Sequence, residues 1–125
     1  MQRTIKFRAW DIDGKQMIPW CDLKYDVTFE EVFDNEFLEV NQYTGLKDKY
    51  GTEIYDGDYI RYSMRTINGS IFTHVCRVFQ HESGTWRIEG YHEDNPSYKT
   101  KGTVYAAHLI CEVIGNIYEH NHLLG

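Results

Sequence analysis

Short segments that alternate apolar and polar residues recur along this chain, and each is followed by residues that favour a turn. Residues two apart share one face of an extended strand, so TIKFRAW (residues 4–10), DYIRYSM (58–64) and TWRIEGY (85–91) are predicted to form half-buried strands. The intervening DIDGK, TINGS and HESG place Asp, Asn and Gly where hairpins turn. Ten tyrosines and six phenylalanines also favour strands, because aromatic side chains fit a pleated surface. The pattern predicts a mostly β fold of antiparallel hairpins that close into a small SH3-like or related barrel, with at most short helical turns.

Length and composition indicate the class of protein. At 125 residues we expect one domain over residues 1–125, large enough to bury its own core. Three cysteines, Cys21, Cys76 and Cys111, show no paired spacing, and no apolar segment follows Met1, so we expect a cytoplasmic protein without disulfides or a secretory signal. The apolar runs are far shorter than the ~20 residues of a membrane helix, so no membrane partner is expected.

Negative charge is concentrated in one segment. The chain has a formal net charge of −6, and residues 22–39 hold seven acids against the single base Lys24, which accounts for the whole imbalance. Nucleic-acid binding depends on basic groups that neutralise phosphates, so this balance argues against a nucleic-acid partner without excluding one. The exception is the N-terminal segment, where Arg8 and Trp10 belong to a basic and aromatic set with Arg3, Lys6 and Phe7. A first strand with charged residues facing water explains the same pattern.

Residues 27–38 are ambiguous between a helix and a hairpin. Thr28 and Glu31 fit a helical capping box, whereas Asp34-Asn35-Glu36 can turn a strand over residues 27–33 back on another over residues 37–43. We favour the hairpin, because the Val, Phe and Thr residues around the turn prefer strands.

The last third of the chain contains a polar and an apolar segment. HEDNPSYKTKG (residues 92–102) is predicted to be a surface loop. LICEVIGNIY (residues 109–118) is predicted to be an apolar strand, with a bulge or a close backbone approach at Gly115.

The stretch QYTGLKDKYGTEIYDGDYIRY (residues 42–62) has the highest density of turn residues. It lacks the Lys-Ser or Lys-Thr of a phosphate-binding P-loop, and its carboxylates do not follow calcium-loop spacing. We predict a structural loop whose glycines adopt φ > 0 and whose acids cap backbone amides: Gly45, Asp48, Gly51, Asp56, Gly57 and Asp58. The predicted binding residues are Lys47, Lys49 and Tyr50 on this loop, and Arg8 and Trp10 from the N-terminal segment.

No arrangement of residues in the sequence indicates catalysis. Cys76 and Cys111 lie in apolar strand contexts, where a thiol is an inert small hydrophobe. The pairs His74/Cys76 and His120/His122 each offer two ligands, which are too few for a metal site. We predict no catalytic residue, no metal and no cofactor.

Three blocks together resemble the YopX family of small phage and prophage proteins of uncharacterised function. They are IKFRAWD (residues 5–11), the central stretch at residues 42–62, and EVIGNIYE (residues 112–119). The central block departs from the family pattern at Tyr50, where the family has Asn, at Asp56, where it has Glu, and at residues 59–60. The tail after Glu119 lacks the family's proline. The resemblance implies a β-rich fold, a phage or prophage origin in a bacterial host cell and self-association, and it transfers no catalytic residue.

Three function classes follow from these observations. We favour a non-enzymatic module that binds a phage or host protein or forms a homo-oligomer, because a domain with so many tyrosines exposes aromatic surface and its acidic segment can steer a basic partner. One alternative is a nucleic-acid-binding β-barrel module. The other is a metal-dependent enzyme with a dispersed site, such as His74, Cys76 and His108.

Overall fold

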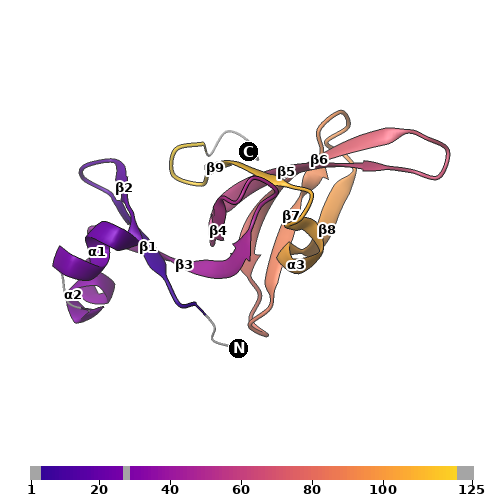
Figure 1. Cartoon of the computed structure of the whole chain (residues 1–125). Helices are drawn as coiled ribbons and strands as arrows, with labels where there is room; N and C mark the ends of the chain where they lie inside the picture. Colours follow the sequence, from indigo (N-terminus) through magenta and orange to yellow (C-terminus); the bar gives the residue numbers. More distant parts are fainter. Residues whose placement is uncertain (1–3, 27–28, 121–125) are drawn as a thin grey trace.

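The computed structural model describes residues 4–26 and 29–120, which form two antiparallel sheets and three short helices (Figure 1). The N-terminal sheet has the strand order β2-β1-β3-β4, with β1 (Phe7–Asp11), β2 (Gln16–Ile18), β3 (Leu38–Lys47) and β4 (Glu53–Tyr55). The C-terminal sheet has the order β8-β7-β6-β5-β9, with β5 (Asp58–Arg65), β6 (Ile71–Gln80), β7 (Trp86–His92), β8 (Lys99–Thr103) and β9 (Glu112–Asn116). The helices are α1 (Trp20–Asp26), α2 (Phe29–Asp34) and α3 (Val104–Ala107). The predicted mostly β fold is confirmed, and the C-terminal sheet curls into a half-barrel around α3.

The predicted hairpins are present, with the predicted turn chemistry. β1 pairs with β2, β5 with β6, and β6 with β7, all antiparallel. In the first turn, Asp11 Oδ1 accepts a hydrogen bond from the Gly14 amide at 3.0 Å. The Asn-Gly turn is closed by a bond of 2.7 Å from the Thr66 amide to the Ser70 carbonyl.

The strand β9 contains the irregularity predicted at Gly115. Tyr59 pairs with Gly115, but the next residue, Ile60, pairs with Val113, so Ile114 is the extra residue of a bulge. An added Cβ at Gly115 would lie 2.5 Å from Nδ1 of His120, so the glycine makes room for that ring.

The hairpin predicted for residues 27–38 is wrong. Residues 29–34 form α2, β3 begins at Leu38, and residues 27–28 with the proposed cap Thr28 lie outside the described residues. Val32 of α2 is buried with Ala9 and Leu23. Tertiary packing on the N-terminal sheet therefore overrides the weak strand preference of this segment.

The loop predicted for residues 92–102 is wrong in its second half, because Lys99–Thr103 forms the edge strand β8. Thr100 is only 8% exposed and makes a hydrogen bond of 2.9 Å with Nδ1 of His74. Lysines on either side of it face outward, which is common on edge strands. Their polarity concealed the strand from a pattern-based prediction.

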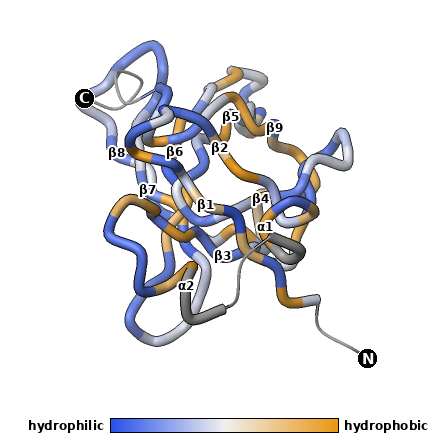
Figure 2. The backbone as a smooth tube through the Cα atoms, turned by 90° about the vertical axis from the view of Figure 1, so that its left-hand side faces the viewer, coloured by the Kyte–Doolittle hydropathy of each residue, from blue (hydrophilic) through white to orange (hydrophobic). Residues whose placement is uncertain are grey.

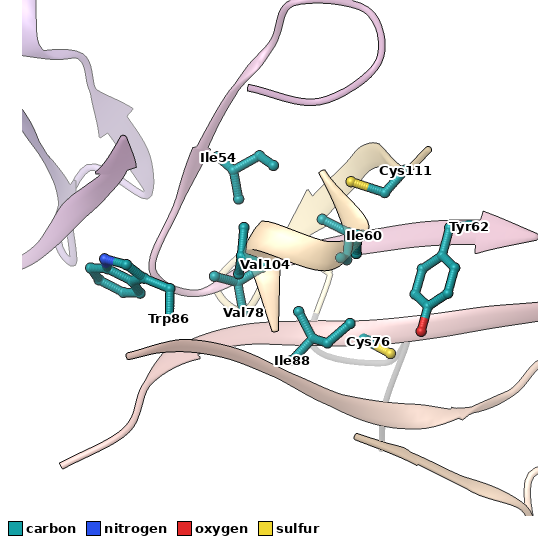
Figure 3. Packing of buried hydrophobic residues seen from close by; sticks show 10 residues of the cluster. Ile54, Ile60, Tyr62, Cys76, Val78, Trp86, Ile88, Val104 and Cys111 are labelled. Carbon is teal, nitrogen blue, oxygen red and sulfur yellow. The ribbon is translucent and has the colours of Figure 1, made fainter. Parts of the chain in front are cut away.

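The main core lies inside the curled C-terminal sheet, where α3 packs against the strands. Figure 3 shows Val104 of α3 directed toward Ile54 and Ile88, and all three are almost completely buried. The cluster comprises Ile54, Ile60, Tyr62, Cys76, Val78, Trp86, Ile88, Val104, Ala107 and Cys111. From the central stretch, Ile54 belongs to this cluster and Leu46 packs against it.

A second, smaller cluster holds α1 and α2 on the N-terminal sheet. It consists of Ala9, Leu23 and Val32, with partly buried neighbours that include Phe7 and Trp20. With a core cluster in each sheet, hydrophobic and hydrophilic segments alternate along the backbone, and neither kind is confined to one half of the molecule (Figure 2). No helix in the described ranges is both long and apolar enough to cross a membrane.

Candidate functional site

A buried ion pair joins the two sheets. Arg8 of β1 and Asp58, the first residue of β5, lie 2.8 Å apart, and their side chains are only 12% and 2% exposed. Asp58 also accepts a hydrogen bond of 2.8 Å from the Tyr55 amide, which fixes the β4–β5 turn. The ion pair thus links β5 of the C-terminal sheet to β1 of the N-terminal sheet.

Polar and aromatic contacts extend this ion pair to the C-terminal end of the described chain. Arg8 Nε donates to Asn41 Oδ1 at 3.1 Å, and its guanidinium lies 4.7 Å from the centroid of the Tyr55 ring. Asn41 Nδ2 in turn donates to Tyr118 Oη at 2.7 Å. We call these five residues, Arg8, Asn41, Tyr55, Asp58 and Tyr118, the Arg8 network.

Burial governs the electrostatics of the Arg8 network. It raises the pKa of Asp58 to about 6, although the Arg8 guanidinium and the Tyr55 amide oppose the rise. The pair is therefore ionised near neutral pH, and the carboxyl takes up a proton in mild acid. Burial also raises the pKa of Tyr55 to about 12, so this phenol stays neutral.

The structure uses the charge of Arg8 inside the fold, so this side chain is not a free cation for a ligand. Trp10, also predicted to bind, stacks on the Tyr118 ring with centroids 5.2 Å apart and an interplanar angle of 7°. Lys6, from the same segment, pairs with Glu53 at 2.7 Å. The basic and aromatic N-terminal segment thus stabilises the junction between the sheets.

The structural role predicted for the central loop is visible in its backbone. Gly45, Gly51 and Gly57 all have positive φ angles. At Gly57 (φ 87°) an added Cβ would also lie 3.3 Å from the Ile117 side chain, so both backbone and packing require glycine there. Asp56 is half-buried, and burial raises its pKa.

Asp48 anchors the central loop to the C-terminal sheet. Its Oδ1 accepts bonds from the Tyr50 and Thr52 amides, both at 2.9 Å, and its Oδ2 accepts a bond of 2.8 Å from the Val113 amide in β9. Lys47, Lys49 and Tyr50 are exposed, and Tyr50 is 70% exposed. The loop is thus rigidly attached while these three side chains face solvent.

The hypothetical metal set of His74, Cys76 and His108 is not brought together. His74 bonds Thr100, whereas His108 lies 3.1 Å from the Lys47 carbonyl. No three His, Cys, Asp or Glu residues converge on one point within residues 4–26 and 29–120. Burial raises the pKa of Cys76 to about 12 and that of Cys111 to about 11, so both thiols stay protonated, as the inert interpretation predicted.

The hairpin of β5 and β6 extends beyond the rest of the C-terminal sheet (Figure 1). The last pair between β5 and β9 is Arg61 with Glu112, and the last pair between β6 and β7 is His74 with His92. Beyond these pairs β5 and β6 bond to each other, and the Thr73 carbonyl also accepts a hydrogen bond of 2.8 Å from the Glu93 amide. We call residues 62–73, the projecting part of this hairpin, the arm.

The arm exposes apolar side chains. Met64 is 52% exposed, Phe72 opposite it 39%, and Ile71 56%, and Ile67 at the tip is fully exposed. Met64 and Phe72 lie on the same face as the core pairs Ile60/Cys76 and Tyr62/His74, because these positions alternate along the strands. An apolar stripe therefore continues from the core onto a projecting element.

The family described as YopX protein matches residues 6–125. The chain belongs to the YopX family. All three sequence blocks that suggested this family supply members of the Arg8 network: Arg8 from the first, Tyr55 and Asp58 from the second, and Tyr118 from the third. The most distinctive motifs of this YopX-family chain thus meet at one structural junction.

Among solved structures, this YopX-family chain is similar to the crystal structure of protein EF1440 from Enterococcus faecalis. The TM-score is 0.58 at 24% sequence identity, and the match covers 99% of this chain and 100% of that one. This likeness supports the fold alone. No curated protein matches the chain.

Sequence reasoning did not find Asn41 or the contacts of Tyr118. Asn41 immediately precedes the central block, and Tyr118 lies in the third block. Their position in or next to these motifs was the one sign in the sequence that they matter. Their partners are far apart along the chain, and no local pattern reports such contacts.

Proposed function

We propose that this chain is a phage- or prophage-encoded accessory protein that works without catalysis, as a module that associates with a second copy of itself through the arm. Membership of the YopX family supports the accessory role. The observation that carries the self-association is the apolar stripe on a hairpin that projects from the fold.

The arm has little to stabilise it within one protomer. A two-stranded hairpin alone is marginally stable in water and needs a further strand or packing surface. Along this face Met64 and Phe72 lie opposite each other and next to the Tyr62/His74 pair, and the Phe72 ring also lies 5.3 Å from the His92 ring, while both side chains stay largely exposed. A partner that covers the stripe would therefore stabilise the arm as well as remove apolar surface from water.

The edge of β5 offers the second copy a strand to pair with. The Thr66 amide bonds to the Ser70 carbonyl, so Thr66/Ser70 is a hydrogen-bonded pair. Hydrogen-bonded and non-hydrogen-bonded pairs alternate along an antiparallel ladder, so the peptide groups of Ser63 and Arg65 point away from β6. Beyond Arg61 no described strand lies on that side. Two such edges can pair antiparallel about a twofold axis, which is the usual geometry of a closed dimer.

Charge also favours a second copy at this end. Arg65 is the single charged residue among residues 62–73, in a chain of net charge −6. The helices α1 and α2, next to the acidic part of the chain, lie at the opposite end of the molecule (Figure 1). Two copies that meet arm to arm therefore keep their acidic ends apart.

Sedimentation over a range of protein concentrations tests this proposal. We expect a dimer whose dissociation is promoted by Met64→Asp, which places a charge in the stripe. Ser63→Pro should also promote it, because it removes one edge amide; it keeps the backbone bonds between β5 and β6 and removes the hydrogen bond of 2.8 Å between the Ser63 and Thr73 hydroxyls. Leu109→Asp is the matched control, because Leu109 is 74% exposed but lies next to α3.

A strict monomer at high concentration would refute the arm-to-arm dimer. So would a dimer that Leu109→Asp dissociates and the two arm variants leave intact. Circular dichroism of each variant confirms that the fold is retained before the assembly state is compared.

A further inference from the structure

One face of the C-terminal sheet turns away from the core and is lined with basic and aromatic side chains. Paired residues of an antiparallel sheet share a face, so the register gives three rows across β5 to β8. They are Phe79–Arg87–Thr103, Tyr59–Arg77–Glu89–Lys101, and Arg61–Val75–Tyr91–Lys99. Tyr59 and Val75 in these rows are buried, so the accessible part of the face lies toward β7 and β8. Core residues such as Ile60, Val78 and Ile88 occupy the alternate positions. We call this surface the outer face.

The outer face is basic although the chain is acidic. The strands β6, β7 and β8 contain four cations, Arg77, Arg87, Lys99 and Lys101, against the single acid Glu89, so they carry a net charge of +3 in a chain of −6. These cations differ from Arg8 and Lys6, whose charges are used inside the fold.

Three of these cations are available to a ligand. Arg87, Lys99 and Lys101 form no ion pair with any residue in the described ranges. Arg61 is different, because Glu93 holds it at 2.9 Å. Arg77 interacts with Asp56 and lies 5.7 Å from the Phe79 ring centroid. The free positive charge therefore gathers toward β7 and β8.

A shallow pocket of about 520 Å³ lies at the free cations. Two of them, Arg87 and Lys101, line it beside Phe79 and the acid Glu89. Thr103 also lines it, but its hydroxyl caps α3 by accepting a hydrogen bond of 3.2 Å from the Ala106 amide. This volume is within the range of small-ligand sites, roughly 300–1,000 Å³. The pocket combines an aromatic ring with two cations and one carboxylate, so its charged lining has a net charge of +1.

We propose that the outer face binds single-stranded nucleic acid, with one base against Phe79 in the pocket and backbone phosphates on Arg87, Lys101 and Lys99. A base stacks on an aromatic ring irrespective of its sequence, and nearby cations follow the backbone. An acidic peptide matches the charge but presents a flat ring only where it has an aromatic residue, whereas every nucleotide carries a base. This surface is separate from the arm and does not depend on self-association.

Fluorescence anisotropy with a labelled oligothymidine of about 12 nucleotides tests the proposal over a range of salt concentrations. Each phosphate neutralised on a single strand contributes about −0.7 to the slope of log K against log salt, so three free cations predict a slope near −2. The double variant Arg87→Gln/Lys101→Gln should bind more weakly, with a slope near −0.7. Phe79→Ala should weaken binding about 5- to 150-fold at unchanged slope, because one stacked base is lost.

Two controls separate this site from general charge effects. Lys15→Gln removes an exposed cation from the turn between β1 and β2, away from the outer face, and should leave the affinity unchanged. An oligoglutamate of equal charge should fail to displace the oligonucleotide.

Four outcomes would overturn the proposal. The first three are no binding at low salt, equal weakening by Lys15→Gln, and equal competition by the oligoglutamate. An unchanged affinity of Phe79→Ala would also overturn it, because binding would then need no base.

Discussion

Removal of the Arg8 side chain should destabilise the fold at neutral pH and much less in mild acid. Arg8→Met keeps a long apolar stem but leaves the Asp58 carboxylate, only 2% exposed, without its cation. Two unit charges about 4 Å apart interact by about 4 kcal/mol at an effective dielectric constant of about 20. Breaking a buried pair from one side typically costs about 3–5 kcal/mol. We therefore expect a loss of about 4 kcal/mol in the free energy of unfolding near pH 7.5.

The pH dependence follows from the raised pKa of Asp58. It is about 6 with Arg8 present, and removal of a group that lowers it can only raise it further. Near pH 5 the folded variant therefore holds a proton that an unfolded aspartate, with a pKa of about 3.9, has mostly released. The free energy of unfolding of the variant therefore rises as pH falls through the pKa of Asp58 in the folded state. Near pH 5 the difference in this free energy between the native chain and the variant should shrink to about 1–2 kcal/mol, which corresponds to the packing and hydrogen bonds that Arg8 also provided.

Urea unfolding followed by tryptophan fluorescence measures both values, at one fixed protein concentration because association affects apparent stability. The double variant Arg8→Met/Asp58→Asn serves as the control. It removes both charges and keeps an oxygen for the Tyr55 amide, so it should recover most of the loss at neutral pH. A loss below about 1 kcal/mol at neutral pH, or an equal loss at both pH values, would refute the reasoning.

Three further predictions concern the loop and the histidine beside β8. Gly57→Val should lower the melting temperature by about 10 °C, because it combines a positive φ with a contact to Ile117, whereas Gly45→Ala, with open space around its Cβ, should lower it less. Asp48→Ala should cost about 2–4 kcal/mol in chemical unfolding, because three amides lose their acceptor, and Asp48→Asn should cost less since it keeps one oxygen. Burial, with a contribution from a neighbouring histidine, lowers the pKa of His74, so its contribution to stability is present above a pH of about 6.5 and lost as pH falls below it. His74→Gln should therefore flatten the decline of melting temperature between about pH 7 and pH 5, and an unchanged decline would contradict this.

The sequence allowed the parts of the fold that follow local rules to be predicted. Alternation along residues 58–64 places Ile60 and Tyr62 on the buried side of β5, and the Asn-Gly dipeptide closes the following turn. The positive φ of Gly57 followed from the composition of its turn. Each of these features is decided within a few residues, so pattern reasoning reaches it.

The features that failed or were missed depend on contacts with distant segments. Residues 29–34 form a helix because Val32 packs on Ala9 of β1, and no local signal shows that surface. The role of Arg8 was missed because its partner Asp58 lies fifty residues away, and an exposed strand accounts equally well for a basic residue near the N-terminus. The pairing of β6 to β8 placed Arg87 and Lys101 beside Phe79, and sequence spacing alone does not reveal that proximity.

The hydrogen bond between Asn41 and Tyr118 spans 77 positions of the chain, and it bears on how the protein folds during synthesis. Closing so long a loop carries an entropic cost that must be met before the contact stabilises anything, and topologies rich in such contacts fold slowly. While the ribosome is still making the last residues, β1 and β3 can pair, but Tyr118, which joins them to the end of the chain, has not yet been added. A nascent chain therefore completes its structure only after the third block has left the exit tunnel, and a chain that ends before Tyr118 is expected to expose its unfinished junction to chaperones and proteases.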